Sequence, residues 1–129
     1  MKSLTYLFKD IPKLRTFLES HTLLFSQTAK SILVQVFSSL PDRKVLGRIT
    51  DEIREHIPKA VIVGSTTVGE IIDGQPKVRT VVLSFSFFDE TVLKTFVVAD
   101  PVGTEFEAGK NLMKEINSME EVAGVLLFA

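Results

Sequence analysis

Residues 61–72 constrain the fold of this chain most, because an apolar run ends there in a hydroxyl-rich turn between two glycines. They read Val-Ile-Val-Gly-Ser-Thr-Thr-Val-Gly-Glu-Ile-Ile. Val and Ile favour a buried, pleated strand, whereas Gly64 and Gly69 can adopt backbone angles that a β-carbon forbids. In open α/β sheets, small polar ligands bind in loops that follow the carboxyl ends of strands. The segment therefore predicts a buried strand that leads into a candidate ligand-binding turn.

A strand–helix–strand unit precedes this turn. Residues 31–37 form an apolar run of strand length, and residues 60–63 form another. Between them, residues 42–56 carry apolar side chains at helical spacing and are followed by Pro58, which ends a helix. Two strands joined by such a crossover run parallel, and the crossover is right-handed. We therefore expect a parallel pair.

Other patterns extend this unit to a larger sheet. Residues 78–88 and 91–99 are rich in β-branched and aromatic side chains and predict an antiparallel hairpin with its tip at residues 89–90. The remaining predicted elements are a helix at 12–20, a polar connection at 21–30, a short strand at 69–72 before an Asp-Gly turn, a helix at 104–119 and a strand at 122–128. The fold class is α/β: a mixed sheet with a parallel β-α-β start, a central antiparallel hairpin and flanking helices.

The 129 residues suit one principal domain. We expect residues 1–30 to form an N-terminal helix and linker, and residues 31–129 to form the α/β domain. That domain is expected to be incomplete at its C-terminus, because its last predicted strand ends with the chain.

Composition excludes several classes of protein. The net charge is −1 and the charges are scattered, so no basic patch for nucleic acid or an anionic membrane surface is evident. The chain has no cysteine, which excludes disulfide scaffolds and zinc–thiolate sites. No apolar run approaches the roughly 20 residues that span a bilayer, and the N-terminus is too polar for a signal peptide. We expect a cytoplasmic domain that binds neither nucleic acid nor membrane.

Polar side chains follow both strands of the predicted parallel pair. If the strands are neighbours, their hydroxyls share one sheet edge and form a polar pocket. The alternative is that these hydroxyls bond their own backbone, or that Ser39 or Asp42 caps the next helix. The candidate ligand-binding residues are Phe37, Ser38, Ser39, Gly64, Ser65, Thr66, Thr67, Gly69 and Glu70.

Glu70 admits two interpretations. Its carboxylate could hold a ligand amine or act as a general base. We favour a structural role, with the side chain exposed at a sheet edge or paired with an arginine such as Arg79, because no partner acid or base is evident.

No complete catalytic set is evident, so we expect no enzyme activity and no cofactor. His21 and His56 are far apart in the sequence, and a metal site is not expected. The acidic residues of the 42–56 helix, Glu52 among them, are interpreted as a solvated face.

Four segments resemble the N-terminal FIST domain, named for F-box and intracellular signal transduction proteins. The first is the strand Ile-Leu-Val-Gln-Val-Phe-Ser-Ser at 32–39, and the most distinctive is Val-Gly-Ser-Thr-Thr-Val-Gly-Glu-Ile at 63–71. The others are the predicted hairpin, from 81–88 to 96–98, and the ending Gly-Val-Leu-Leu-Phe-Ala at 124–129. The resemblance covers residues 31–129. Ser65 stands where the family often has Cys, so thiol chemistry is not carried over to this position.

The resemblance implies a sensory input module of a bacterial signalling protein, with amino acids or related metabolites as the ligand class. It also implies two partners, a C-terminal FIST portion and a signalling output domain. Our first hypothesis is therefore ligand sensing at the Gly64–Gly69 turn. The alternative is a protein-interaction or scaffolding domain with an exposed sheet edge, for which a homo-oligomer is one arrangement.

Overall fold

The computed structural model describes the chain except residues 1, 28, 41, 99–103 and 129. The described residues divide into two units: residues 2–93 with Phe128 form the first, and Lys94–Leu127 form the second.

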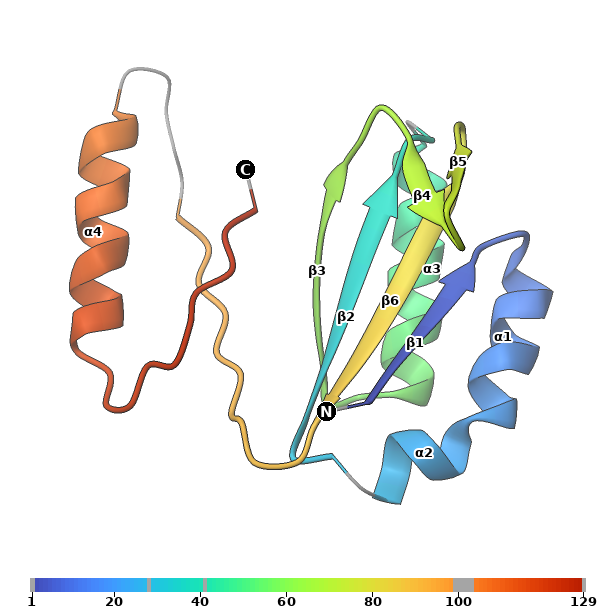
Figure 1. Cartoon of the computed structure of the whole chain (residues 1–129), viewed down its shortest axis with the longest axis horizontal. Coiled ribbons are helices and arrows are strands. Elements are labelled where there is room, and N and C mark those ends of the chain that lie inside the picture. The colour runs from blue at the N-terminus through green and yellow to red at the C-terminus, as the bar shows by residue number, and fades with distance from the viewer. Residues whose placement is uncertain (1, 28, 41, 99–103, 129) are drawn as a thin grey trace. The chain divides into compact units, whose positions relative to one another are not determined.

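A four-stranded mixed sheet forms the centre of the first unit (Figure 1). The strand order is β1-β6-β2-β3. β2 and β3 are parallel, whereas β6 runs antiparallel to both of its neighbours, β1 and β2. The strands are β1 (Lys2–Leu7), β2 (Ser31–Ser38), β3 (Ala60–Thr66) and β6 (Val81–Phe88).

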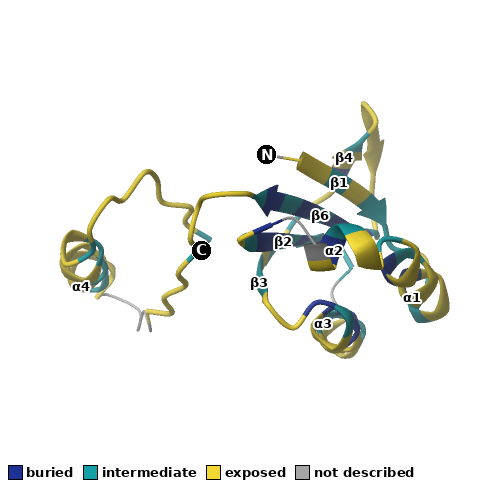
Figure 2. Ribbon diagram, turned by 90° about the horizontal axis from the view of Figure 1, so that it is seen from below, coloured by how far each residue is buried: buried dark blue, intermediate teal, exposed yellow. Residues whose placement is uncertain are grey.

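Three helices lie on one face of this sheet (Figures 1 and 2). They are α1 (Ile11–Ser20), α2 (Thr22–Gln27) and α3 (Arg43–His56). Alternate residues of the strands point toward them, because successive side chains of a strand lie on opposite faces. The core between sheet and helices is apolar and closed to solvent; its fully buried members include Leu14, Leu18, Ile32, Val34, Ile49, Ile53, Leu83 and Phe85.

Aspartates begin both of the longer helices of this unit. Asp10 Oδ1 accepts a hydrogen bond from the Lys13 amide at 2.8 Å, and Pro12 occupies the first turn of α1. Asp42 Oδ1 accepts from the amides of Lys44 (2.9 Å) and Val45 (3.1 Å) at the start of α3. Such caps satisfy amide groups that have no partner within the helix.

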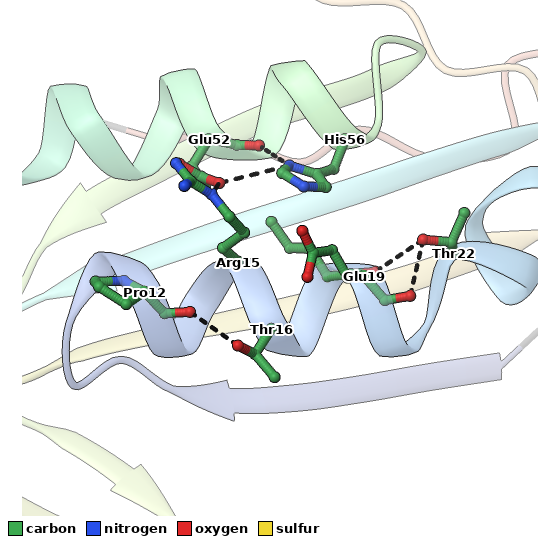
Figure 3. A network of polar contacts seen from close by, with 8 residues as sticks. Pro12, Arg15, Thr16, Glu19, Thr22, Glu52 and His56 are labelled. Carbon is green, nitrogen blue, oxygen red and sulfur yellow. Dashed lines mark hydrogen bonds and ion pairs between the residues drawn. The ribbon is translucent and has the colours of Figure 1, made fainter.

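A carboxylate buried between α1 and α3 joins the two helices (Figure 3). Both oxygens of Glu52 accept hydrogen bonds from Arg15, from Nε at 2.7 Å and from an Nη atom at 3.0 Å. His56 lies one turn further along α3, with Nδ1 2.9 Å from the Glu52 carbonyl oxygen. The side chain of Glu52 is only 6% exposed, so its assignment to a solvated face is wrong. The packing of α1 against this side of α3 is the reason.

Arg15 also changes the ionisation of Glu52. Its hydrogen bonds lower the pKa of Glu52, and its charge acts in the same direction. Burial opposes these effects but does not cancel them. Glu52 is therefore a charged, paired group inside a helix–helix contact.

The predicted parallel unit is confirmed. Helix 12–20, strand 31–37, helix 42–56 and strand 60–63 all form, and β2 pairs with β3 from Ile32–Ala60 to Ser38–Thr66. A small two-stranded sheet follows, of β4 (Glu70–Ile72) and β5 (Gln75–Lys77). Asp73 and Gly74 connect these strands with φ values of 50° and 72°, which is the two-residue turn that Asp-Gly favours.

Two elements near the N-terminus were not predicted. β1 adds an edge strand to the sheet, and its Leu4 and Tyr6 pack against the core. The polar connection predicted at 21–30 contains α2, whose Phe25 is buried against Phe85 and Phe87. The fold class, an α/β fold with a mixed sheet, is confirmed.

The prediction of a central antiparallel hairpin is wrong. Residues 91–98 form no strand, and the predicted last residue of that strand lies outside the described residues. β6 already pairs with β1 on one side and β2 on the other, so no hydrogen-bonding edge is left beside it for a returning strand. The predicted strand β6 also begins later, at Val81 rather than residue 78.

The second unit contains α4 (Glu105–Asn117), which confirms the helix predicted at 104–119. Residues 122–128 form no strand, contrary to prediction, because no hydrogen-bonded neighbour pairs with them. Among the described residues, no helix is long and apolar enough to cross a membrane.

Candidate functional site

β2 and β3 end side by side, as parallel strands of one unit do. The register pairs Phe37 with Ser65 and Ser38 with Thr66, so the two hydroxyl-bearing strand ends meet at one edge of the sheet. Gly64 allows the strands to approach here. A β-carbon at this position would lie 2.2 Å from the carbonyl oxygen of Val36. The contact between the strands therefore requires glycine at this position, which lies within β3 rather than in the turn predicted at 64–69.

A shallow pocket of about 290 Å³ lies between these strand ends and α3. Hydroxyl groups and aliphatic side chains line it together, and every lining side chain is uncharged. The residues are Val36, Ser38, Leu46, Thr50, Ile62, Val63, Gly64, Ser65 and Thr66. The position corresponds to the ligand site of open α/β sheets, at the carboxyl ends of parallel strands.

The structure divides the nine predicted site residues into three sets. Four of them, Ser38, Gly64, Ser65 and Thr66, line the pocket. Phe37 and Gly69 do not line it, and the remaining three belong to a separate polar cluster described next. Ligand contact by the four pocket residues stays a prediction.

The polar cluster is built around the carboxylate of Glu70, which is 6% exposed. Its Oε2 accepts hydrogen bonds from the hydroxyls of Ser39 (2.8 Å) and Thr80, and its Oε1 accepts one from Thr67. Ser39 and Thr80 are also joined directly, since the Thr80 amide donates to Ser39 Oγ at 3.1 Å. Three hydroxyls, rather than Arg79, are thus the partners of Glu70.

These hydroxyls keep Glu70 ionised. Burial raises the pKa of the carboxyl, but the hydrogen bonds from Thr67, Thr80 and Ser39 lower it by more, and the net direction is down. The three donors come from the end of β2, the β3–β4 turn and the residue before β6. Glu70 therefore holds the turn against two strands. The prediction that its side chain is exposed at a sheet edge or paired with Arg79 is wrong, because the carboxylate is buried and bonded to three hydroxyls.

The turn is fixed at two further points. The Thr67 amide donates to the Ser38 carbonyl oxygen at 2.8 Å. A β-carbon on Gly69 would lie 2.9 Å from the carbonyl oxygen of Lys77, so the turn passes close to the end of β5. The turn is consequently bonded to β2 and passes close to β5, while Val68 between these two points is 97% exposed.

The pocket hydroxyls also bond nearby main chain. Ser38 Oγ donates to the Leu40 carbonyl oxygen at 2.9 Å and accepts from the Leu40 amide at 3.1 Å. Ser65 Oγ donates to the Thr66 carbonyl oxygen at 3.1 Å. A hydroxyl can therefore bond its own main chain and line the pocket at the same time, so the two interpretations of these residues do not exclude each other.

Sequence reasoning missed Thr50 and Thr80. Thr50 follows Leu46 by four residues, so the helical period that identified the inner face of α3 could have found it. Thr80 becomes a neighbour of Ser39 only through the pairing of Ser38 with Val81, and no local signal reveals that register.

The described residues offer no metal site and no second candidate pocket. No group of three metal-ligating side chains is close enough to hold an ion in the parts that the structure describes. A larger hollow of about 670 Å³ runs along α4, but that single helix lines it, so it is an open surface groove.

The fold and the pocket define a class: a mixed α/β domain with a small-molecule-sized hollow at the carboxyl ends of its parallel strands. The family model described as the FIST N domain matches residues 32–129, and the chain belongs to this family. FIST domains are sensory domains of signal transduction. Neither the curated proteins nor the solved structures contain a match to this chain.

Proposed function

We propose that this chain is a small-ligand-sensing input module of a bacterial signal-transduction protein and that it binds amino acids or related metabolites. One observation carries the proposal: a FIST N domain has a hydroxyl-lined pocket where the parallel strands β2 and β3 end. The partners we propose are a C-terminal FIST portion and a cytoplasmic output domain.

The placement of the pocket supports a signalling role. A ligand there touches α3 through Leu46 and Thr50 and the sheet through β2 and β3. α3 is in turn joined to α1 by the Glu52–Arg15 pair. A ligand that prefers one packing of α3 on the sheet shifts the population toward that packing. We propose no reaction, because the pocket hydroxyls donate to main-chain carbonyls rather than to a general base.

Thermal shift tests this proposal directly. Binding to the folded state raises Tm by mass action, so a dose-dependent rise with an amino acid or related metabolite is expected. Thr66→Val should reduce the rise, because it removes a pocket hydroxyl. Thr5→Val is the matched control, an exposed threonine on the other edge strand. An equal rise in Tm in both variants would show that Thr66 does not contact the ligand. If no compound raises the Tm of the folded protein, ligand sensing is refuted.

Protein interaction is the second candidate function. Large apolar side chains of the second unit are exposed, among them Val97 (98%), Phe106 (76%) and Leu127 (75%). Exposed apolar surface of this kind marks interaction sites. Sedimentation across a concentration range tests the homo-oligomeric form of this candidate: association is expected, and a strictly monomeric chain would count against it.

A further inference from the structure

Three of the four hydroxyl groups among the pocket residues already donate a hydrogen bond within the protein. Each donates it to a main-chain carbonyl oxygen in its own segment. The bonds run from Ser38 Oγ to Leu40 (2.9 Å), from Thr50 Oγ1 to Gly47 (2.8 Å) and from Ser65 Oγ to Thr66 (3.1 Å).

A hydroxyl that has donated its proton can only accept further hydrogen bonds, because it carries one donor and two acceptor sites. Ser38 Oγ also accepts from the Leu40 amide, which leaves it one acceptor site. Thr50 keeps its lone pairs and lies on the same side of the sheet as Ser38. The Ser65 side chain points to the opposite face, because Ser65 alternates with Gly64 and Thr66 along β3. The α3 side of the pocket therefore presents the acceptors of Ser38 and Thr50 beside the Thr66 hydroxyl, and these oxygens match a ligand group that donates hydrogen bonds.

No charged side chain of either sign lines the pocket, so recognition there rests on hydrogen bonds and apolar contact rather than on a counter-charge. Helix N-termini usually attract anions, but the amides at the start of α3 already donate to the carboxylate of Asp42. Arg43 and Lys44 are exposed on the same turn and do not line the pocket.

The rest of the lining is hydrocarbon. Val36, Leu46 and Ile62 supply aliphatic surface on the α3 side, and about 290 Å³ is at the small end of the range for ligand pockets. We infer that the pocket takes a small aliphatic amine, with its ammonium group on the hydroxyl oxygens of Ser38 and Thr50 and its hydrocarbon body on these side chains. An ammonium group carries three donors, and recognition does not need a carboxylate. This inference rests on the proposed ligand-sensing function.

Three probes of similar shape separate the ligand groups. They are 3-methylbutylamine, L-leucine and 4-methylpentanoate, each titrated into the full chain at neutral pH and followed by calorimetry and by amide chemical shifts. We expect the amine and leucine to bind and to move the signals of residues 62–66, with the carboxylate at least about tenfold weaker, since one hydrogen bond to a charged group is worth about that factor.

The outcomes distinguish the inference from the proposed function. If 4-methylpentanoate binds as tightly as the amine, the pocket recognises the anion and the amine assignment is wrong, while ligand sensing stands. Binding of leucine without binding of the amine has the same meaning. If none of the three binds, both the amine assignment and ligand sensing through this pocket are refuted.

Thr50→Val tests the acceptor role within the protein. It keeps the shape of the side chain and removes the oxygen, so amine affinity should fall about tenfold with the fold intact by circular dichroism. Thr16→Val is the matched control, because Thr16 Oγ1 also donates to a carbonyl of the preceding turn, that of Pro12 at 3.1 Å, on a different helix (Figure 3). Thr66→Val is a second variant that should weaken amine binding, because the Thr66 hydroxyl lies on the same face of the sheet as Ser38. Unchanged amine affinity in both pocket variants would overturn the inference.

Discussion

Gly64→Ala is the substitution whose effect follows most directly from the geometry. The added carbon would lie 2.2 Å from the carbonyl oxygen and 3.1 Å from the carbonyl carbon of Val36. Because the obstacle is main chain in the paired strand, no rotamer change relieves the overlap. The two strands must separate by about 1 Å, and overpacking of this kind costs roughly 2–3 kcal/mol of unfolding free energy.

Gly47→Ala supplies a control of opposite sign. Gly47 lies inside α3, and a β-carbon there meets nothing within 4 Å. Alanine favours a helix over glycine by about 0.5–1 kcal/mol, so this variant should be more stable than the parent. The same chemical change therefore stabilises one site and destabilises the other.

Thermal unfolding followed by circular dichroism measures both variants. At roughly 4 °C per kcal/mol for a domain of this size, Tm should fall by about 8–12 °C in Gly64→Ala and rise by about 2–4 °C in Gly47→Ala. A Gly64→Ala protein as stable as the parent would refute the reasoning, because it would show that the strands do not approach as described.

Three further predictions concern the core and the buried carboxylate of Glu70. Phe85→Ala should cost about 3–5 kcal/mol in urea unfolding, since Phe85 is fully buried, whereas Phe106→Ala at an exposed site should change stability by less than about 0.5 kcal/mol; similar losses in both would contradict the core assignment. Glu70→Gln should remove hydrogen-exchange protection at the Thr67 amide while amides of β2 stay protected, and a uniform loss would mean only global destabilisation. Because the pKa of Glu70 is lowered in the folded state, this carboxylate contributes stability that is complete above its unfolded pKa near 4.5 and is lost as pH falls through its folded pKa. The urea midpoint of Glu70→Gln should therefore fall less than that of the parent as pH is lowered. Parallel plots of urea midpoint against pH for the two proteins would exclude this contribution.

Local signals predicted the β-α-β unit well. The apolar runs of β2 and β3, the capping aspartate before α3 and the Asp-Gly turn each act over a few residues, so their structural consequences can be derived from the sequence. The meeting of Ser38 and Thr66 followed from the parallel pairing alone.

Long-range pairing could not be derived in the same way. Apolar and polar residues alternate along 91–99 as they do in a strand. The edge of β6 is nevertheless occupied by β1, which comes from the start of the chain. Alternation shows that a segment can join a sheet, but the register and the competing neighbours decide whether it does. The same reason hid Thr80 from the candidate site, because its contact with Ser39 depends on the β2–β6 register.

Glu52 shows a related limit for helices. The helical period identifies an apolar face, but it does not reveal that a second helix covers part of the polar face. Arg15, 37 positions earlier in the sequence, makes burial of the Glu52 carboxylate acceptable by pairing with both of its oxygens.

The sheet order has a consequence for assembly. β2 and β6 are paired on both sides, so β1 and β3 are the two edges at which a further strand can add. β3 also forms one wall of the pocket. A strand that joins at β3 therefore lies against the residues that a ligand touches. A strand that joins at β1 is separated from β2, the nearer of the two pocket strands, by β1 and β6. By thermodynamic linkage, a partner added at β3 and a ligand change each other's affinity by the same factor.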